Sequence, residues 1–374
     1  MNKNITRTIC IKLDLATHDP VLTATMKAFN SAAAWIARVC WDEGITNTNT
    51  AHHRVYGETR ERFGLAAQLA VNARAKAVEA VKSVKAKKRE TCPVFGPRGS
   101  VRMDNHHSYS FKPLDHVSLL TMEGRITCRM ILGARQHAML TDPAWESGTA
   151  DLVWRRGVYY LHVTQSRVAP DVDDTGGVIG VDLGIVNVAV DSDGQIFTGE
   201  QVRKVRARYK RQREELQKVG TKSAKRKAKR KSGTEARFQS DVNHCISKTL
   251  VAKAVASCKA LALEDLTGIR ERLTVRHEQR YERHSWAFYQ LRTYIAYKSA
   301  HAGVRVTLVD PRNTSRTCPE CGHCAKANRR TQSEFLCQQC GYTALADFVG
   351  ARNIQTVAVN QPMVAAPVSV CRKS

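Results

Sequence analysis

The feature that most constrains the fold of this chain is a pair of short cysteine motifs, each of the form C-x-x-C-G. Cys318 and Cys321 make the first motif, Cys337 and Cys340 make the second, and fifteen residues separate the two. The glycine after each motif permits a tight turn, and two such turns place four thiolates around one tetrahedral Zn²⁺. A redox pair of the thioredoxin type needs only one motif, so the matched motifs favour a structural zinc ribbon with no open ligand position.

The other cysteines are expected to be ordinary side chains. Cys324 lies at the right distance from Cys321 to be a ligand, but no glycine follows it, so we interpret it as a bystander. The remaining cysteines are scattered, as small apolar residues are in a reducing compartment. They are Cys10, Cys40, Cys92, Cys128, Cys245, Cys258 and Cys371.

The charge balance narrows the class of partner. The chain of 374 residues has 59 Lys and Arg against 34 Asp and Glu, a net charge of +25. Such a surplus attracts polyanions, either nucleic acid or an acidic membrane surface. The first ten residues lack the apolar segment of a signal peptide, and no apolar run of 18 residues exists. We therefore predict two or three domains, a cytoplasmic location associated with the nucleoid, and nucleic acid as the partner, with no membrane.

Three acidic residues stand within or beside apolar segments, at nearly equal distances of 82 and 83 residues. Asp182 belongs to residues 178–194, which predict two antiparallel strands with Asp182 near the middle of the first and a turn at Asp193-Gly194. Glu264 ends an apolar strand, and Asp347 opens a helical pattern. Taken by itself, Asp182 could be a residue that caps a turn. Burying a carboxylate in an apolar strand, however, costs free energy unless another group pairs with it.

These stretches carry a family resemblance. GVDLGIVNVAV, LALEDL and DFVGARNI resemble the three RuvC motifs of the TnpB (OrfB) family of insertion-sequence proteins, which the miniature type V CRISPR nucleases share. The resemblance covers about residues 178–355, including NHCISK at 243–248 and VDPRNTS at 309–315. The cysteine motifs lie between the second and third carboxylates, where the family has them. Residues 348–350, Phe-Val-Gly, depart from the Asn and Ala of many relatives, and residues 1–170 match only in general layout.

The resemblance implies a multidomain α/β protein: an RNase H-like (RuvC) nuclease domain with an inserted zinc ribbon, preceded by a small β-barrel (wedge) domain that carries a helical insertion (recognition lobe). A plain scaffold is the alternative role of that insertion. The linker to the nuclease domain is expected at 169–177. The expected boundaries are 1–19 for the first wedge strand, 20–92 for the recognition lobe, 93–170 for the wedge barrel, 171–309 for the first part of the RuvC-like domain, 310–345 for the zinc ribbon, 346–358 for the last RuvC-like helix, and 359–374 for a disordered tail.

Local patterns predict the elements of these domains. In the first half, residues 5–13 alternate as a strand, residues 22–40 and 65–84 have helical periodicity, and a loop rich in Thr, Asn and His lies at 46–54. Further strands are predicted at 108–111, 116–121, 125–132, 151–154 and 158–164. In the second half, helices are predicted at 234–256, 278–303 and 347–357, and strands at 260–263 and 304–309.

Residues 203–231 hold fifteen Lys and Arg and only two Glu. A charge run is usually the solvated face of a helix, and this alternative stays open. Fifteen cations almost without counter-charges repel one another. We therefore favour the interpretation that this run lies along the phosphates of a nucleic acid. The predicted nucleic-acid contacts are Lys204, Arg208, Arg211, Lys225, Arg226, Lys229 and Arg230, with Arg316, Arg329 and Arg330 on the zinc ribbon.

The three carboxylates suit metal-assisted phosphodiester hydrolysis. Two Mg²⁺ about 3.5–4 Å apart activate a water and neutralise the phosphate, and hard cations require carboxylate oxygens. We expect Asp182 to bridge both ions, with Glu264 and Asp347 each holding one. Asp265 is the rival of Glu264, but the next residue on a strand points to the other face. Asp191 and Asp193 are better explained by the hairpin turn.

The leading prediction is an Mg²⁺-dependent, RNA-guided DNA endonuclease of the TnpB kind, which cleaves target DNA beside a short flanking motif. Its implied partners are a guide RNA and double-stranded target DNA, bound by a monomer or by a dimer on one RNA. The alternatives are a compact type V CRISPR nuclease that uses a crRNA, a non-cleaving RNA-guided repressor and a DNA-joining transposase. Repressors of this kind usually lose a carboxylate, and TnpB proteins are accessory to a separate transposase.

Overall fold

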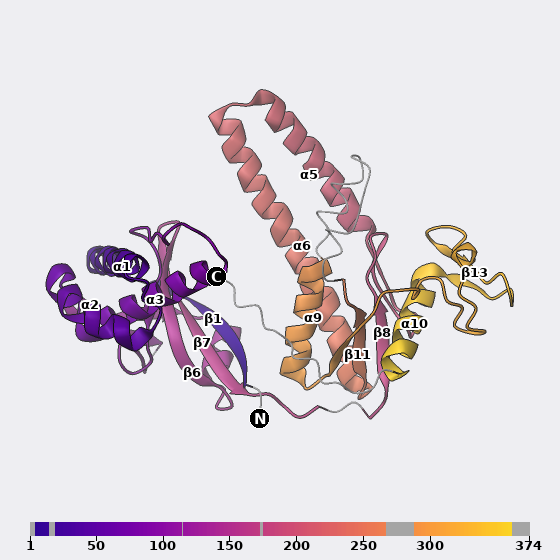
Figure 1. Ribbon diagram of the computed structural model, residues 1–374, viewed down its shortest axis with the longest axis horizontal. Coiled ribbons are helices and arrows are strands. Elements are labelled where there is room, and N and C mark those ends of the chain that lie inside the picture. Colours follow the sequence, from indigo (N-terminus) through magenta and orange to yellow (C-terminus); the bar gives the residue numbers. More distant parts are fainter. Residues whose placement is uncertain (1–3, 15–18, 114, 173–174, 267–287, 361–374) are drawn as a thin grey trace. The chain divides into compact units, whose positions relative to one another are not determined.

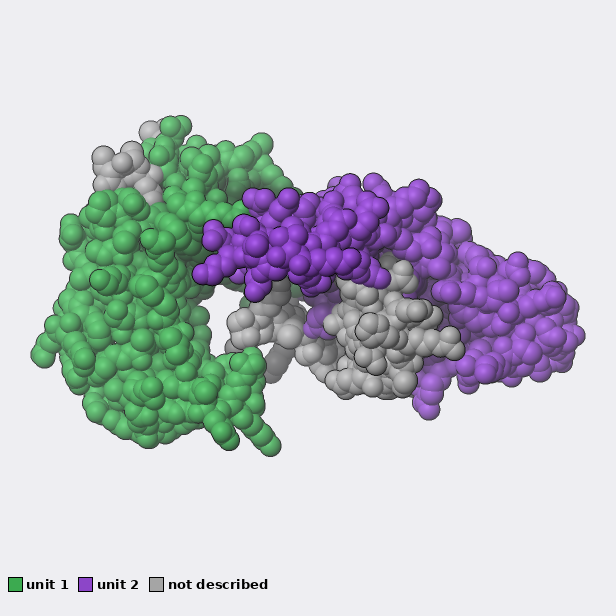
Figure 2. Space-filling view, turned by 90° about the horizontal axis from the view of Figure 1, so that it is seen from above, with its two compact units in different colours: residues 1–168, 371–374 green, residues 169–370 purple. Residues whose placement is uncertain are grey.

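The computed structural model describes residues 4–14, 19–113, 115–172, 175–266 and 288–360. The chain divides into two compact units between Val168 and Ala169, where the predicted linker begins. Figure 1 shows the helices and strands, and Figure 2 colours the two units separately. Each unit has buried apolar clusters of its own, so each has its own reason to fold.

The first unit is built on a seven-stranded antiparallel sheet in the order β2-β6-β7-β1-β5-β4-β3. Its strands are β1 (Asn4–Asp14), β2 (Val101–Met103), β3 (Tyr109–Lys112), β4 (His116–Thr121), β5 (Gly124–Ile131), β6 (Glu146–Arg155) and β7 (Val158–Val168). The strand predicted at 5–13 is confirmed, and as β1 it pairs with β7 and β5 at the centre of the sheet. The hydroxyl of Tyr109 on β3 donates to the Gly148 carbonyl on β6, so the sheet curls toward a barrel. The short strand β2 and the helix α4 (Ala134–Thr141) are additions that the sequence patterns do not predict.

Three helices, rather than the two predicted, form the helical insertion of this unit: α1 (Asp19–Asp42), α2 (Thr48–Phe63) and α3 (Ala67–Ala86). The helices α1 and α3 contact the sheet, and α2 packs on these two helices. The loop predicted at 46–54 is wrong, because α2 begins there. Asn47 caps this helix by accepting hydrogen bonds from the backbone of Asn49 and Thr50 at 2.8 and 3.2 Å. Burial of Ala51, Val55 and Thr59 then stabilises the helix by more than the low helix propensity of Thr, Asn and His destabilises it.

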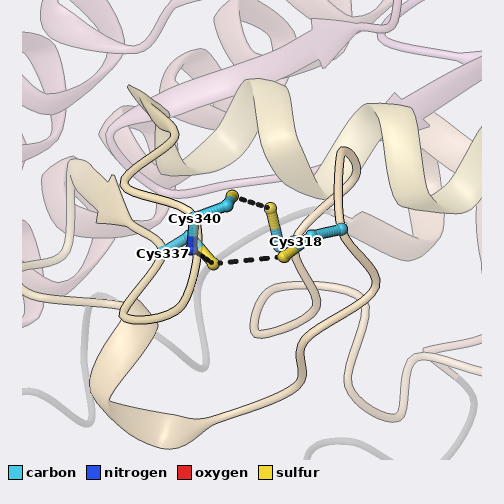
Figure 3. Close-up of side chains that lie close together, drawn as sticks. Cys318, Cys337 and Cys340 are labelled. Carbon is cyan, nitrogen blue, oxygen red and sulfur yellow. Dashed lines mark hydrogen bonds between the residues drawn. The ribbon is translucent and has the colours of Figure 1, made fainter.

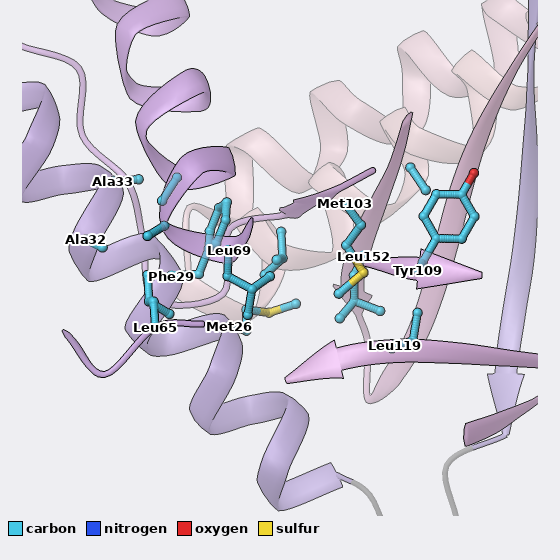
Figure 4. Packing of buried hydrophobic residues seen from close by; sticks show 14 of the residues in the cluster. Met26, Phe29, Ala32, Ala33, Leu65, Leu69, Met103, Tyr109, Leu119 and Leu152 are labelled. Carbon is cyan, nitrogen blue, oxygen red and sulfur yellow. The ribbon is translucent and has the colours of Figure 1, made fainter. Parts of the chain in front are cut away.

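Helices and strands share one apolar core in this unit. Figure 4 shows Met26 and Phe29 of α1 with Leu69 of α3 beside the strand residues Met103 and Leu152. These side chains are 0 or 1% exposed. The helical periodicity that predicts α1 therefore marks the face that packs on the sheet.

The second unit contains a five-stranded sheet in the order β10-β9-β8-β11-β12. Its strands are β8 (Val178–Asp182), β9 (Asn187–Asp191), β10 (Ile196–Thr198), β11 (Ala260–Glu264) and β12 (Val306–Val309). The predicted hairpin of β8 and β9 is confirmed, while β11 runs parallel to both β8 and β12. The prediction that Asp182 lies near the middle of its strand is wrong, because it is the last residue of β8.

Helices lie on both faces of this sheet. They are α5 (Glu200–Val219), α6 (Lys222–Ala256), α9 (Phe288–Ala302) and α10 (Ala346–Asn360). Ile179 and Leu261 pack toward α6 and α9, whereas Val178 and Ala260 pack toward α10. Gly180 permits the close approach of α10, because a methyl group there would lie 2.1 Å from a backbone oxygen of that helix.

The remaining helix predictions are confirmed in part. The helix predicted at 234–256 is longer than expected, since α6 begins at Lys222 and takes in the end of the basic run. Of the helix predicted at 278–303, α9 accounts for the later part, and residues 278–287 lie outside the described residues. The closing helix α10 extends to Asn360, and the tail predicted beyond it also lies outside the described residues.

Candidate active site

Three carboxylates come together at one edge of the second sheet. Asp182 and Glu264 are the last residues of β8 and β11. These strands are parallel neighbours, with Leu263 opposite Val181, so both side chains leave the sheet at the same edge. Asp347 is the second residue of α10, which packs on β8. The three residues predicted from the sequence are therefore neighbours, although 82 and 83 residues separate them in the chain.

Burial and mutual repulsion mark this edge as an electrostatically strained site. Burial raises the pKa of Asp182 to about 8, and the nearby Glu264 and Asp347 carboxylates contribute to the rise. Burial also raises the pKa of Glu264, against the opposing effects of a hydrogen bond from Thr314 and of the Arg329 charge. Carboxylates that cannot all ionise together are stabilised by a cation between them.

Neighbouring polar groups fix two of the carboxylates. Asn187, the first residue of β9, donates from Nδ2 to Asp347 Oδ2 at 2.8 Å. Thr314 donates from Oγ1 to Glu264 Oε1 at 2.5 Å. The sequence analysis assigned no role to either residue. Both lie inside the stretches that carry the family resemblance, and their place in those stretches is the signal by which they could have been predicted.

Arg329 has a different position from the one expected of a surface cation. Its guanidinium Nη2 lies 4.0 Å from Asp347 Oδ1, and its side chain is 33% exposed. It also lowers the pKa of Asp182 and of Glu264 through its charge. Arg329 thus carries a positive group from the cysteine module to the carboxylate edge.

The rival acidic residues have other partners. Asp265 pairs with Arg292 of α9 at 2.8 Å. Asp191 accepts from the backbone of Asp193 and Gln195 in the hairpin turn, and Lys253 donates to its other oxygen at 2.6 Å. The hairpin explanation of Asp191 is therefore confirmed.

The cysteine module lies between β12 and α10 and contains the hairpin of β13 (Glu334–Leu336) and β14 (Thr343–Leu345). Its four predicted ligand atoms all lie within 4.8 Å of one another (Figure 3). The Sγ atoms of Cys318 and Cys340 are 3.6 Å apart, and those of Cys321 and Cys337 are 3.5 Å apart. Thiolates about 2.3 Å from a tetrahedral Zn²⁺ have nearly this separation, so the cluster fits zinc.

The two candidate metal sites differ in how tightly they are assembled. Over the described ranges, only the four cysteines form a group of three or more ligand atoms within 4.8 Å of one another. The carboxylates Asp182, Glu264 and Asp347 are coupled through their charges but are more widely spaced. Their oxygen ligands suit hard divalent cations, whereas the thiolates suit zinc. Cys324 is exposed and stands outside the four-cysteine group, as expected of a bystander.

The basic run forms a hairpin of two helices. Seven of its predicted contact residues are exposed on α5 and α6: Lys204, Arg208, Arg211, Lys225, Arg226, Lys229 and Arg230. Other cations of the run brace the hairpin instead, since Arg206 is 8% exposed and donates to Gln239, while Arg213 pairs with Glu235. Arg316 and Arg330 are exposed on the cysteine module. The run is thus divided between braces and an exposed basic surface.

Comparison with known proteins shows which family the chain is similar to. The Cas12f1-like TNB domain model matches residues 288–354, and the OrfB_IS605 model, described as a probable transposase, matches residues 160–268. These matches make the chain similar to the TnpB (OrfB) family. It is 34% identical over 218 residues to the putative RNA-guided DNA endonuclease InsQ of Escherichia coli, covering 53% of each chain. It is 29% identical over 189 residues to the TnpB-like protein MJ0751 of Methanocaldococcus jannaschii, covering 47% of this chain and 67% of that protein.

The family is related to the miniature type V effectors. The chain is 40% identical over 120 residues to the CRISPR-associated endodeoxyribonuclease Cas12f1 of Sulfoacidibacillus thermotolerans, covering 32% of this chain and 27% of that protein. It thus spans only about a quarter to a half of the length of Cas12f1 and InsQ.

Solved structures share the fold of this chain. The Cas12f1 chain of a Cas12f1–sgRNA–target DNA complex has a TM-score of 0.66 at 13% identity, covering 94% of this chain and 99% of that one. CasPhi-2 (Cas12j) bound to crRNA has a TM-score of 0.60 at 11% identity, covering 96% and 98%. The multidomain α/β architecture is therefore that of these effectors. In the part of the chain that the structure describes, no helix is both long and apolar enough to cross a bilayer.

Proposed function

We propose that the protein is an RNA-guided DNA endonuclease of the TnpB kind, which hydrolyses phosphodiester bonds of target DNA. The observation that carries the proposal is the meeting of Asp182, Glu264 and Asp347 at one sheet edge, with Arg329 beside them. The names of InsQ and Cas12f1, which describe endonucleases, support it. The repressor alternative is less favoured, because all three carboxylates are present.

Asp182, Glu264 and Asp347 would together hold the catalytic Mg²⁺ ions. Such ions supply Lewis-acid activation of water and neutralise charge on the phosphate. The crowding of Asp182 with Glu264 and Asp347 favours cation binding, because the ionised carboxylates otherwise repel one another. Asn187 would orient Asp347 by its hydrogen bond at 2.8 Å.

Arg329 would act on the substrate phosphate. Its Nη2 lies 4.0 Å from Asp347 Oδ1 and donates to the Gln332 carbonyl at 3.1 Å, a bond to a neutral acceptor that an incoming anion could replace. A guanidinium offers two parallel N–H groups to phosphate oxygens and stabilises the charge that develops there. In this proposal the four cysteines bind one structural Zn²⁺, which holds the module and therefore Arg329 in place.

The exposed basic surface of α5 and α6 would follow the phosphates of the guide RNA or of its duplex with target DNA. The first unit would supply the wedge domain and the recognition lobe. The solved complexes with sgRNA and target DNA, and with crRNA, support RNA and DNA as the partners. A guide that comes from the transposon is favoured by the similarity to InsQ and to the TnpB-like protein MJ0751.

The test is to sequence the RNA that copurifies with the protein and to offer double-stranded DNA matched to it, across candidate flanking sequences. We expect a single defined RNA and Mg²⁺-dependent cleavage of the matched DNA only. Guide-directed binding without any cleavage by the unmutated protein would move it to the repressor class, and the absence of a defined RNA would overturn guided recognition.

A further inference from the structure

Thr314 is the protein group in closest contact with the Glu264 carboxylate. It lies in the turn that leaves β12 and enters the cysteine module, and it is 4% exposed. Its Oγ1 is 2.5 Å from Glu264 Oε1, a short distance that is typical of a hydroxyl donating to a carboxylate. A surface turn does not need a buried hydroxyl directed at an acid, so the contact calls for an explanation.

The backbone of Thr314 is held by the helix that also carries Asp347. Asn353 of α10, which is 7% exposed, donates from its amide to the carbonyl of Thr314 at 2.6 Å and to that of Thr317 at 2.7 Å. The turn before Thr314 includes Asn313 in the left-handed region at φ 64°. Thr314 therefore has a fixed position relative to α10, and through it the second and third carboxylates share one support.

The Thr314 hydroxyl has one proton and two acceptors within reach, Glu264 Oε1 at 2.5 Å and the Pro311 carbonyl at 3.0 Å. A carboxylate accepts a stronger hydrogen bond than a neutral carbonyl does, so the proton goes to Glu264. Among the described residues, no side chain or backbone group donates to the other oxygen, Oε2. One oxygen of Glu264 is thus occupied by the protein and the other is left for a ligand.

We propose that Thr314 is a positioning residue for Glu264: by occupying Oε1, it fixes the rotation of the carboxylate and presents Oε2 to a divalent cation. This inference rests on the proposed function of the carboxylate edge. It also assigns the cysteine module a second task, because the turn that leads into the module carries the group that orients a cation ligand.

The test compares Thr314→Val, which keeps the branched shape but removes the hydroxyl, with Thr314→Ser, which keeps the hydroxyl. Thr317→Val is the matched control, since Thr317 lies in the same turn and its hydroxyl bonds only the Asn313 carbonyl at 3.0 Å. The first readout is the Mn²⁺-induced rise in melting temperature of the full chain freed of RNA, with Asp182→Ala protein used to subtract Mn²⁺ bound elsewhere. The second readout is the Mn²⁺ concentration for half-maximal cleavage by the guide complex.

We expect Thr314→Val to weaken Mn²⁺ binding by about tenfold or more, the usual effect of losing a group that orients a metal ligand. Thr314→Ser and Thr317→Val should bind Mn²⁺ like the unmutated protein, and all variants should keep their zinc. The proposal is overturned if Thr314→Val binds Mn²⁺ normally, if Thr317→Val is equally weak, or if serine does not restore binding. Thr314→Ala replaces the valine variant if the latter does not fold.

The two proposals fail in different ways. If the unmutated protein cleaves no matched DNA, the proposed function fails, while the melting readout still decides the role of Thr314. If the protein cleaves DNA and Thr314→Val matches it at every Mn²⁺ concentration, only the positioning role is lost. An unmutated protein whose Mn²⁺ stabilisation does not depend on Asp182 would overturn the positioning role as well.

Discussion

The cysteine module and the carboxylate edge are both candidate metal sites, but the chain builds them in opposite ways. The four cysteines lie within 23 residues of sequence, and their sulfur atoms already stand within 4.8 Å of one another. The carboxylates come from β8, β11 and α10, and they meet only because the sheet brings two strand ends together under a helix. A local site is assembled by its own turns, whereas a non-local site depends on the whole unit.

The largest expected effect is at the non-local site. Asp182→Ala, Glu264→Ala and Asp347→Ala should each reduce cleavage of matched DNA on the order of 10⁴-fold or more, because removing one member of a catalytic group disables the set. Guide-directed DNA binding should persist, since no basic residue is changed. Cleavage and binding are measured on the same preparations. Normal cutting by any one of the three variants would remove that residue from the site.

At the local site, Cys337→Ser should lower the zinc content from one per chain to almost none. The loss should also reduce cleavage by about ten- to a hundredfold, because Thr314 and Arg329 are positioned through the module. Elemental analysis and cleavage assays test both effects. Cys324→Ser is the control and should keep zinc and activity; equal loss in the control would make Cys324 a ligand. Full cleavage without zinc would show that the two sites are independent.

A third prediction concerns the exposed basic surface, which belongs to neither site. Changing Lys225, Arg226, Lys229 and Arg230 together to Gln should flatten the dependence of log K on log salt concentration by about three, since each phosphate contact contributes about 0.7 to 0.9. RNA binding across a salt series measures this slope. Arg213→Gln, which removes a brace to Glu235, is the control and should lower the melting temperature with little change of slope. An unchanged slope in the fourfold variant would show that these residues do not contact phosphates and form only a solvated helix face.

The smallest expected effect is the pH dependence of stability in the metal-free protein. The pKa of Asp182 is raised to about 8, so this residue stays protonated in the folded chain but ionises in the unfolded chain above its ordinary value of 3.8. Its contribution to the free energy of unfolding is therefore fully present below about pH 4 and is lost as the pH rises toward 8. Chemical denaturation between these limits should show the fall, and Asp182→Asn should remove it. A stability profile identical in both proteins would contradict the buried, coupled state of Asp182.

The sequence predicted the local site and the individual elements better than the connections between them. The spacing of Cys318, Cys321, Cys337 and Cys340 sufficed because their turns are short. Glu264 and Asp347 were found because a strand or helix pattern stops or starts beside them. The helix α2 was missed because the Asn47 cap and tertiary packing, rather than propensity, stabilise it.

Contacts between residues that are far apart in the sequence could not be predicted from local sequence patterns. Nothing in local periodicity distinguishes Thr314 from Thr317, and only the fold shows that one of them faces Glu264. Likewise, Arg329 was predicted as one surface cation among many, and its position near Asp347 follows from how the module returns to α10. Side-chain partners that depend on topology require the assembled unit.

The junction between the module and α10 limits how the length of such a chain can vary. The strand β14 ends at Leu345 and α10 begins at Ala346, so no residue separates the cysteine module from the helix that carries Asp347. Residues added before the second cysteine pair would enlarge the module while leaving the length of chain from Cys340 to Asp347 unchanged. A residue added between Cys340 and Asp347 would rotate the acid away from β8. Natural insertions should therefore be common on one side of the second cysteine pair and rare on the other.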